Sequence, residues 1–170
     1  MPDSPTLDDL RVLAHPLRLR ILSLLTGTAM SAAEAARELD ETQANVSYHL
    51  RRLHEAGLLD IVEEVSIRGG RAKRYRHDPE SGPRLTERNP EEDHVLLTSA
   101  AEELKRRIAF RAPEHPASIT DAELWVDPEV WAQALRQATE LSRLLHEAAE
   151  PPRTAGTVRV SASVALFELR

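Results

Sequence analysis

The chain has 170 residues, of which 41% are hydrophobic, and its net charge of −6 comes from 28 acidic residues against 22 lysines and arginines. This composition is typical of a globular protein that can bury a core. The chain contains no cysteine, which excludes disulfide bonds, thiolate metal sites and cysteine nucleophiles.

The N-terminal stretch MPDSPTLDDLRV lacks the cationic start and the apolar run of a secretory signal peptide. No later stretch is apolar enough over a sufficient length to span a bilayer. We therefore expect a cytoplasmic protein that makes no membrane contact.

The negative net charge disfavours nucleic acid as a partner, but the charges are unevenly distributed along the chain. Residues 43–77 carry seven cations and four carboxylates, a balance of +3. From residue 79 onward eleven cations face sixteen carboxylates, a balance of −5. Such an asymmetry is expected if one segment meets DNA and the other does not.

The first predicted elements are two helices. Apolar residues recur at steps of three and four over residues 7–25, which is the spacing of one buried helical face. His15 and Pro16 interrupt this run, and proline suits the first turn of a helix. We predict one helix over about residues 7–13 and a second that begins near Pro16 and ends at Gly27, with His15 as a capping or packing residue.

A helix, a tight turn and a second helix follow. Ser31 and Glu34 form a capping box at the start of a small-residue helix over residues 32–39. After the turn, Thr42 is expected to cap a helix that ends at Gly57. The apolar face of this last helix holds Val46, Leu50 and Leu53.

A basic hairpin comes next. Residues 58–77 contain two β-rich runs around the glycine pair 69–70, which indicates a hairpin. A helix-turn-helix followed at once by a cationic hairpin is the order of elements in a winged helix, where the hairpin lies along the DNA backbone. The cations expected at the hairpin are Arg68, Arg71, Lys73 and Arg74.

The segment 78–89 is rich in proline, serine and glycine and has the composition of a linker. We therefore divide the chain into a winged helix-turn-helix DNA-binding domain at 1–80 and a dimerisation and effector region at 81–170. The predicted fold class is α+β and mainly α: a winged helix-turn-helix, a helical dimerisation segment and a small α+β C-terminal region.

Within the second region the apolar spacing predicts a helix over 90–110 and another over 128–149. Alternation of apolar residues with period two predicts a strand over 157–169, and a short strand is expected over 122–126.

The predicted helix after the turn presents a polar and cationic side opposite its apolar face. In the major groove, amide side chains can pair with adenine and arginine with guanine, while other cations and hydroxyls hold phosphates. Any single amphipathic helix exposes polar residues, but the preceding helix and the basic hairpin favour DNA. The base-reading candidates are Gln43, Asn45 and Tyr48, and the candidates for backbone contacts are Thr42, Ser47, Arg51 and Arg52.

Three motifs, LAHPLRLRILSLL, TQANVSYHLRRLHEAGLL and RGGRAKRYR, occur in this order. Over about residues 7–77 they resemble the ArsR family of bacterial repressors, and the second half loosely resembles the longer actinobacterial-type members. The resemblance implies a homodimer on an inverted-repeat operator in double-stranded DNA, which represses transcription until an effector binds. It also implies a dimer interface formed by the first helix and the helix from Pro90, with Leu7, Leu10, Val95, Leu97, Ala101, Leu104 and Ile108.

The chain departs from the metal-sensing members of that family. The place of their paired cysteines reads SAAEAARELDE, and Asp93 directly precedes His94 where relatives carry an Asp-x-His ligand pair. Lys105 and Ile108 occupy the register of their second ligand pair. We therefore predict neither a metal nor a cofactor, and we expect His49 to pack at the edge of the core.

A small-molecule effector remains a candidate partner. Trp125 and Trp131 flank a predicted helix start and are candidates for lining an apolar effector pocket, although two aromatic residues at such a place are more often core.

An enzyme is not expected, because we find no nucleophile with its base, no paired carboxylates and no phosphate-binding glycine loop at suitable spacing. The alternative that stays open is a winged-helix module that binds a protein and no specific DNA, as the acidic second half allows.

Overall fold

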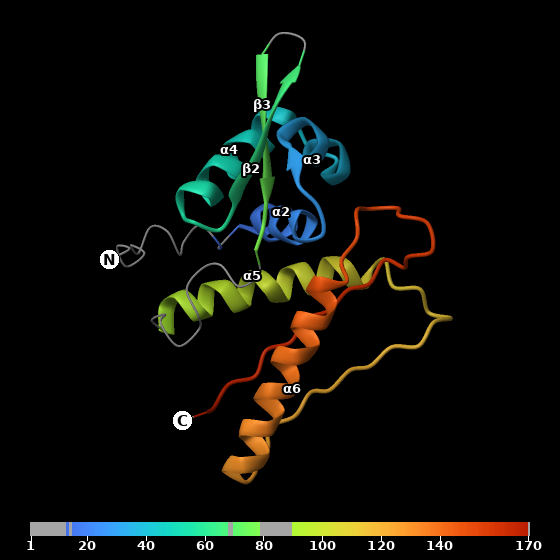
Figure 1. The fold of residues 1–170 in the computed structure, drawn as a ribbon. Helices are drawn as coiled ribbons and strands as arrows, with labels where there is room; N and C mark the ends of the chain where they lie inside the picture. The colour runs from blue at the N-terminus through green and yellow to red at the C-terminus, as the bar shows by residue number, and fades with distance from the viewer. Residues whose placement is uncertain (1–12, 14, 68–69, 79–89, 170) are drawn as a thin grey trace.

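The structure is a computed structural model that describes residues 13, 15–67, 70–78 and 90–169. The first part is a helical body with a small sheet, and two long helices follow it (Figure 1). The sheet has three antiparallel strands in the order β1-β3-β2, so the structure confirms the α+β winged helix-turn-helix class. The elements in chain order are α2 (Pro16–Thr26), β1 (Met30–Ser31), α3 (Ala32–Leu39), α4 (Gln43–Glu55), β2 (Asp60–Ile67), β3 (Gly70–Arg76), α5 (Pro90–Ile108) and α6 (Pro128–Glu147).

Some predictions lie outside the described residues. These are the helix over 7–13 with Leu7 and Leu10, the hairpin cation Arg68, and the domain boundary near residue 80.

Helix starts in the first half are set by local caps, as the sequence predicted. At α2, Nδ1 of His15 accepts a hydrogen bond from the backbone N–H of Leu17 at 3.2 Å, and Pro16 occupies the first turn. At α3, Ser31 and Glu34 bond reciprocally, with the Ser31 N–H donating to the Glu34 carboxylate at 2.7 Å. At α4, the Thr42 hydroxyl accepts from the backbone N–H of Asn45 at 3.3 Å. Each cap satisfies a backbone donor that the helix leaves unpaired.

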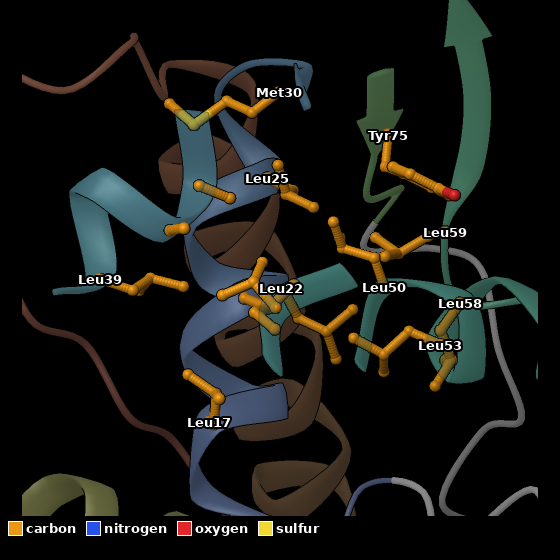
Figure 2. Packing of buried hydrophobic residues seen from close by; sticks show 14 of the residues in the cluster. Leu17, Leu22, Leu25, Met30, Leu39, Leu50, Leu53, Leu58, Leu59 and Tyr75 are labelled. Atoms are coloured by element: carbon orange, nitrogen blue, oxygen red, sulfur yellow. The ribbon is translucent and has the colours of Figure 1, made fainter. Parts of the chain in front are cut away.

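The core fills the space between α2, α3, α4 and the sheet (Figure 2). Ile21 and Leu25 of α2 and Val46, Leu50 and Leu53 of α4 are completely buried. Burial of a side chain of this size contributes roughly 1.5–3 kcal/mol, so these residues dominate the stability of the domain. The remaining members are Leu13, Leu17, Leu22, Met30, Ala35, Ala36, Leu39, Leu58, Leu59 and Tyr75.

The sheet ties the hairpin to this core. Tyr75 of β3 is paired with Met30 of β1 on one side and with Ile61 of β2 on the other. Tyr75 lies at the base of the hairpin of β2 and β3. From this base the hairpin projects away from the helical body as a wing (Figure 1). The register of β2 against β3 shifts between Ile61 and Glu63, which marks a bulge near the base of the wing.

The turn between α3 and α4 is compact. Asp40 adopts the left-handed conformation, with φ 54° and ψ 51°, and the backbone N–H of Glu41 donates to the carbonyl of Ala36 at 3.0 Å. From α2, the guanidinium of Arg20 donates to the carbonyl of Leu39 at 2.7 Å and lies 3.8 Å from the Glu41 carboxylate. Arg20 therefore fixes the turn against α2.

The second half is built differently. Helix α5 packs on α2, and Leu96 of α5 contacts the core. Helix α6 points away from the winged domain (Figure 1), and none of its side chains is buried. Both helices end two residues earlier than predicted, at Ile108 and Glu147. None of the helices in the described ranges combines the length and the apolarity needed to cross a membrane.

Two predicted strands are wrong for the single chain. Residues 122–126 and 157–169 form no strand in the structure. A strand requires a neighbour to accept its ladder of hydrogen bonds, and the described part of the chain supplies none at these places.

We predict that Asp40→Gly raises the free energy of unfolding by up to about 1 kcal/mol and that Asp40→Val lowers it by about 1–2 kcal/mol, because a β-branched side chain is strained in the left-handed region. The measurement is urea unfolding followed by circular dichroism. The control is Asp121→Val, at an exposed position without positive φ, which should leave stability unchanged. Equal stability of Asp40→Val and the wild type would show that the turn can relax.

Candidate nucleic-acid interface

One side of α4 is anchored in the core and the other is exposed. Val46, His49, Leu50 and Leu53 are buried, which fixes the rotation of the helix about its own axis. All the α4 residues predicted to contact DNA, together with the cap Thr42, lie on the outer side. Thr42, Gln43, Asn45, Tyr48 and Arg51 are exposed, and Ser47 and Arg52 are half-buried.

The polar contacts on this outer side are short-range and exposed. Asn45 donates to the Glu41 carboxylate at 3.2 Å, and Nε of Arg51 donates to the carbonyl of Ser47 at 3.4 Å. Arg52 lies 3.4 Å from the carboxylate of Glu55. Exposed contacts of this kind are worth about 0–1 kcal/mol, so an arriving nucleic acid can replace them at little cost.

The wing carries cations beside this face. Arg71 of β3 is exposed and pairs across the strands with Glu64 at 2.8 Å. Lys73 is exposed on the same strand, in register with Glu64. Because both side chains reach solvent, they are in a position to contact a phosphate backbone that runs past the wing.

Arg74 behaves differently from its neighbours. Its guanidinium is 28% exposed and donates to the Glu34 carboxylate at 3.1 Å and to the carbonyl of Ala29 at 2.5 Å. It also lies 3.6 Å from the carboxylate of Glu63. These contacts join the wing to the start of α3. The expectation that Arg74 contacts DNA stays a prediction.

The partner of Arg74 is itself held in its charged form. Burial raises the pKa of Glu34, but the hydrogen bonds from the backbone and hydroxyl of Ser31 and the positive charge of Arg74 outweigh it, so that pKa lies below its usual value. Glu34 therefore acts twice, as part of the α3 capping box and as the anchor of the wing. The sequence signal identified only the first role.

Beneath α4, a histidine connects the helix to α2. His49 is 5% exposed, and its Nδ1 accepts a hydrogen bond from Nε of Arg18 at 3.1 Å. Its ring lies 4.6 Å from that of His15 and 5.2 Å from that of Tyr48. Burial lowers the pKa of His49, and the nearby charges of His15 and Arg18 lower it further, so the ring is neutral at pH 7. The expectation that His49 packs is confirmed, whereas its link to Arg18 was missed.

In the second half, the predicted dimer residues of α5 are accessible in the single chain. Val95, Ala101, Leu104 and Ile108 are exposed, and Leu97 is half-buried. This exposure leaves them available to a partner but does not identify one.

The tryptophan pocket is wrong for the single chain. Trp125 is fully exposed, with a relative accessibility of 102%, so it lines no cavity among the described residues. Trp131 is half-buried on α6. The two tryptophans are separated by a helix start, and nothing in the described part of the chain packs on the first one.

A cavity of about 750 Å³ lies elsewhere, between α2, α3, α5 and residues 148–160. Its lining includes five arginines and three glutamates: Arg20, Arg106, Arg107, Arg153, Arg159, Glu38, Glu103 and Glu150. Within the described ranges, no group of three or more histidine or carboxylate side chains is arranged to hold a metal ion.

We predict that Arg74→Gln lowers the free energy of unfolding by about 1–2 kcal/mol, because it leaves the Glu34 carboxylate and the Ala29 carbonyl without their donor. The matched control is Arg71→Gln on the same strand, which should change stability by less than about 0.5 kcal/mol since its ion pair is exposed. Chemical denaturation measures both. Equal effects of the two substitutions would contradict the anchoring role of Arg74.

We also predict that stability falls as the pH drops below about 6.5, because the unfolded chain then binds protons that the folded chain does not. Burial lowers the folded-state pKa of both His49 and His77, so the stability that their neutral forms contribute is present above that pH and is lost on acidification. His49→Gln should reduce the loss between about pH 7.5 and pH 5. The control His115→Gln, at an exposed position, should follow the wild-type curve. Identical curves for His49→Gln and wild type would refute this role.

Comparisons with known proteins fall on the same part of the chain. Residues 13–62 match the model of a family described as a helix-turn-helix domain, and this span contains α2, α3 and α4. The chain is also 38% identical over 63 residues to an uncharacterized helix-turn-helix-type transcriptional regulator of Methanocaldococcus jannaschii. That match covers 36% of this chain and 63% of the relative, so it spans less than two thirds of the relative's length. The similarity is therefore to a helix-turn-helix module rather than to the whole of either protein.

Proposed function

We propose that the chain is a sequence-specific DNA-binding transcriptional regulator that acts as a homodimeric repressor on an inverted-repeat operator. The observation that carries the proposal is the polar outer side of α4, held rigidly by a buried inner side and bordered by a basic wing. The similarity to a transcriptional regulator of Methanocaldococcus jannaschii supports the same function.

In this proposal α4 enters the major groove. Asn45 and Gln43 lie at the exposed start of the helix, where an amide side chain can pair bidentately with adenine, and Tyr48 follows one turn later. Arg51 and Arg52 lie further along the helix and contact phosphates, together with Ser47. Base reading then belongs to the first two turns of α4, while Arg51 and Arg52 further along set the register on the duplex.

The wing supplies the second set of contacts. Arg71 and Lys73 are exposed at the hairpin and can follow the flanking backbone or the minor groove. Arg74 contributes indirectly, because its bonds to Glu34 and Ala29 hold the wing at a fixed angle to the helices. Loss of an exposed wing cation should therefore weaken binding with little change in sequence preference.

The dimer and the repressor role rest on the resemblance to the ArsR family. Two identical winged helices match an inverted repeat when their recognition helices reach successive major grooves, about 34–36 Å apart. Exposed apolar residues on α5 are available for such pairing. For a small-molecule effector we propose the arginine-lined cavity beside α2 and α3, in place of the tryptophan pair, since a ligand there would contact the DNA-binding half directly.

We predict that Arg51→Ala and Arg71→Ala each weaken duplex binding and each reduce the slope of log affinity against log salt by about 1, the loss of one phosphate contact. The duplex is one selected by the protein from its own upstream DNA by footprinting. Fluorescence anisotropy at several salt concentrations measures both quantities. Arg136→Ala, on the outward side of α6, is the charge-matched control and should leave both unchanged.

Asn45→Ala separates base reading from backbone contact. It should reduce the preference for the selected duplex over a scrambled one by about 1–3 kcal/mol while the salt slope stays the same. If the wild type binds no duplex even at low salt, the regulator is refuted in favour of the winged-helix protein-interaction module.

A further inference from the structure

The two halves of the chain differ sharply in how they treat apolar side chains. Of the 20 large hydrophobic residues that are exposed in the described ranges, 18 lie between residues 95 and 169. All fifteen members of the buried core lie between residues 13 and 75. The first half therefore buries its large hydrophobic side chains in its own core, whereas the second half leaves most of its own exposed to solvent. So many exposed apolar side chains in one half of the chain point to an interaction surface there.

Helix α6 shows the problem most clearly. It has 20 residues, and its apolar residues Trp131, Leu135 and Leu145 recur at helical spacing, yet none of its side chains is buried. In proteins an amphipathic helix derives most of its stability from packing its apolar face against a neighbour. Helix α6 therefore requires a surface to pack against that the described chain does not provide.

The C-terminal tail at 157–169 poses the same problem for a strand. Val158, Val160 and Val164 alternate with polar residues, as in a half-buried strand, but they are 81%, 67% and 55% exposed and the tail pairs with no strand. The segment before α6 also leaves large apolar side chains in solvent, with Ile119 and Trp125 almost fully exposed. Unpaired β-rich segments of this kind are templates for pairing with another chain.

The parts of the chain outside the described ranges hold too few apolar residues to cover this surface. Their large apolar residues are Met1, Leu7, Leu10, Val12 and Leu85. Five side chains are too few to cover 18, so these parts of the chain leave most of the exposed apolar surface uncovered.

We propose that α6, the extended segment 111–127 and the tail 157–169 form the interface with a second copy of this chain, in which the tail becomes a strand by pairing with the partner. The proposal rests on the homodimer proposed above and adds an interface beyond the α5 residues named there. Fourteen of the exposed large apolar side chains lie in these three segments, a substantial part of the 20 to 30 residues that a stable interface uses on each side, and such apolar composition is typical of homodimers.

Symmetry favours a second copy over an unrelated protein. In a two-fold dimer the same patch faces itself, so a tail that lacks a strand partner meets a region with the same unpaired segments. Helix α6 carries two arginines and three glutamates, a balance of −1, so little charge repulsion opposes the approach of two identical helices. Since α6 points away from α4 and the wing (Figure 1), pairing through it leaves both recognition faces open.

The absence of cysteine makes a direct test available. Single-cysteine variants across the tail, Val158→Cys, Val160→Cys and Val164→Cys, are oxidised at micromolar concentration and run on non-reducing gels. We expect at least one of them to give a disulfide-linked dimer, because symmetry brings some position close to its own copy. Ser66→Cys, exposed on β2 of the wing, is the matched control and should stay monomeric on the gel.

Two solution measurements keep the test independent of the cross-link geometry. Leu141→Glu on exposed α6 should raise the dimer dissociation constant on the order of 100-fold in sedimentation, while Arg136→Glu on the opposite side should not. With Trp131→Phe, Trp125 is the single tryptophan, and its emission should shift to the red when the dimer is diluted to monomer.

The outcomes separate this inference from the proposed function. The interface is refuted if the wild-type chain sediments as a monomer. It is also refuted if the dimer is unaffected by Leu141→Glu and the tail cysteines cross-link no more than Ser66→Cys. Duplex binding in those cases would still support the regulator. A tail-linked dimer that binds no duplex supports the interface and refutes the regulator.

Discussion

The packing of α4 against α2 and α3 is the constraint on which the rest of the winged domain depends. Four buried side chains on α4, at positions 46, 49, 50 and 53, occur at steps of three, one and three residues and define one face of the helix. Because each buried apolar side chain is worth roughly 1.5–3 kcal/mol, the helix cannot rotate without losing several of these contributions. The polar residues on the other side are consequently held outward as a rigid, continuous face. The recognition surface is thus a consequence of the core.

A second layer of control comes from three buried or half-buried arginines that the apolar pattern does not reveal. Arg20 holds the turn before α4, Arg18 bonds His49 beneath α4, and Arg74 joins the wing to α3. A guanidinium taken partly out of water must keep its donors paired, so each of these contacts also restricts where its neighbours lie. Together they connect all the parts proposed to contact DNA to a single frame.

The contrast between what the sequence predicted and what it missed follows from the range of the interactions. Caps such as Ser31 with Glu34, or Thr42 with Asn45, act within one turn, so residue types at fixed spacing were sufficient to predict them. Arg71 and Arg74 stand three residues apart on one strand and look alike in the sequence. Only the fold brings Glu34, 40 residues away, to one of them and leaves the other in solvent. Roles decided by distant partners require the structure.

The predicted C-terminal strand is absent for a related reason, because its neighbour is not specified by the pattern of its own residues. A period-two pattern shows that one face of a segment is suited to burial, but it does not name the chain that supplies the neighbour. In the described chain the tail and the residues just before it are joined to the rest by polar contacts: Arg153 bonds Glu38 at 2.8 and 2.9 Å, and Arg107 bonds Ser161 and Ser163 of the tail at 3.3 Å. These contacts are exposed and weak compared with apolar burial, so they orient the tail without fixing it.

Glu38 is the penultimate residue of α3, just before the turn that leads into α4, and Arg107 lies near the end of α5. Residues 153–163 therefore contact both the DNA-binding half and the helix that carries the predicted dimer residues. If a partner chain buries the apolar side of the tail, the free energy of that burial exceeds that of the exposed polar contacts and fixes where the tail lies. The polar side of this C-terminal segment then contacts α3 from a fixed position. Dimer formation would in that way affect the position of α3 and, through the turn, of the recognition helix α4. The tail would transmit this effect, and its own fold would depend on the dimer.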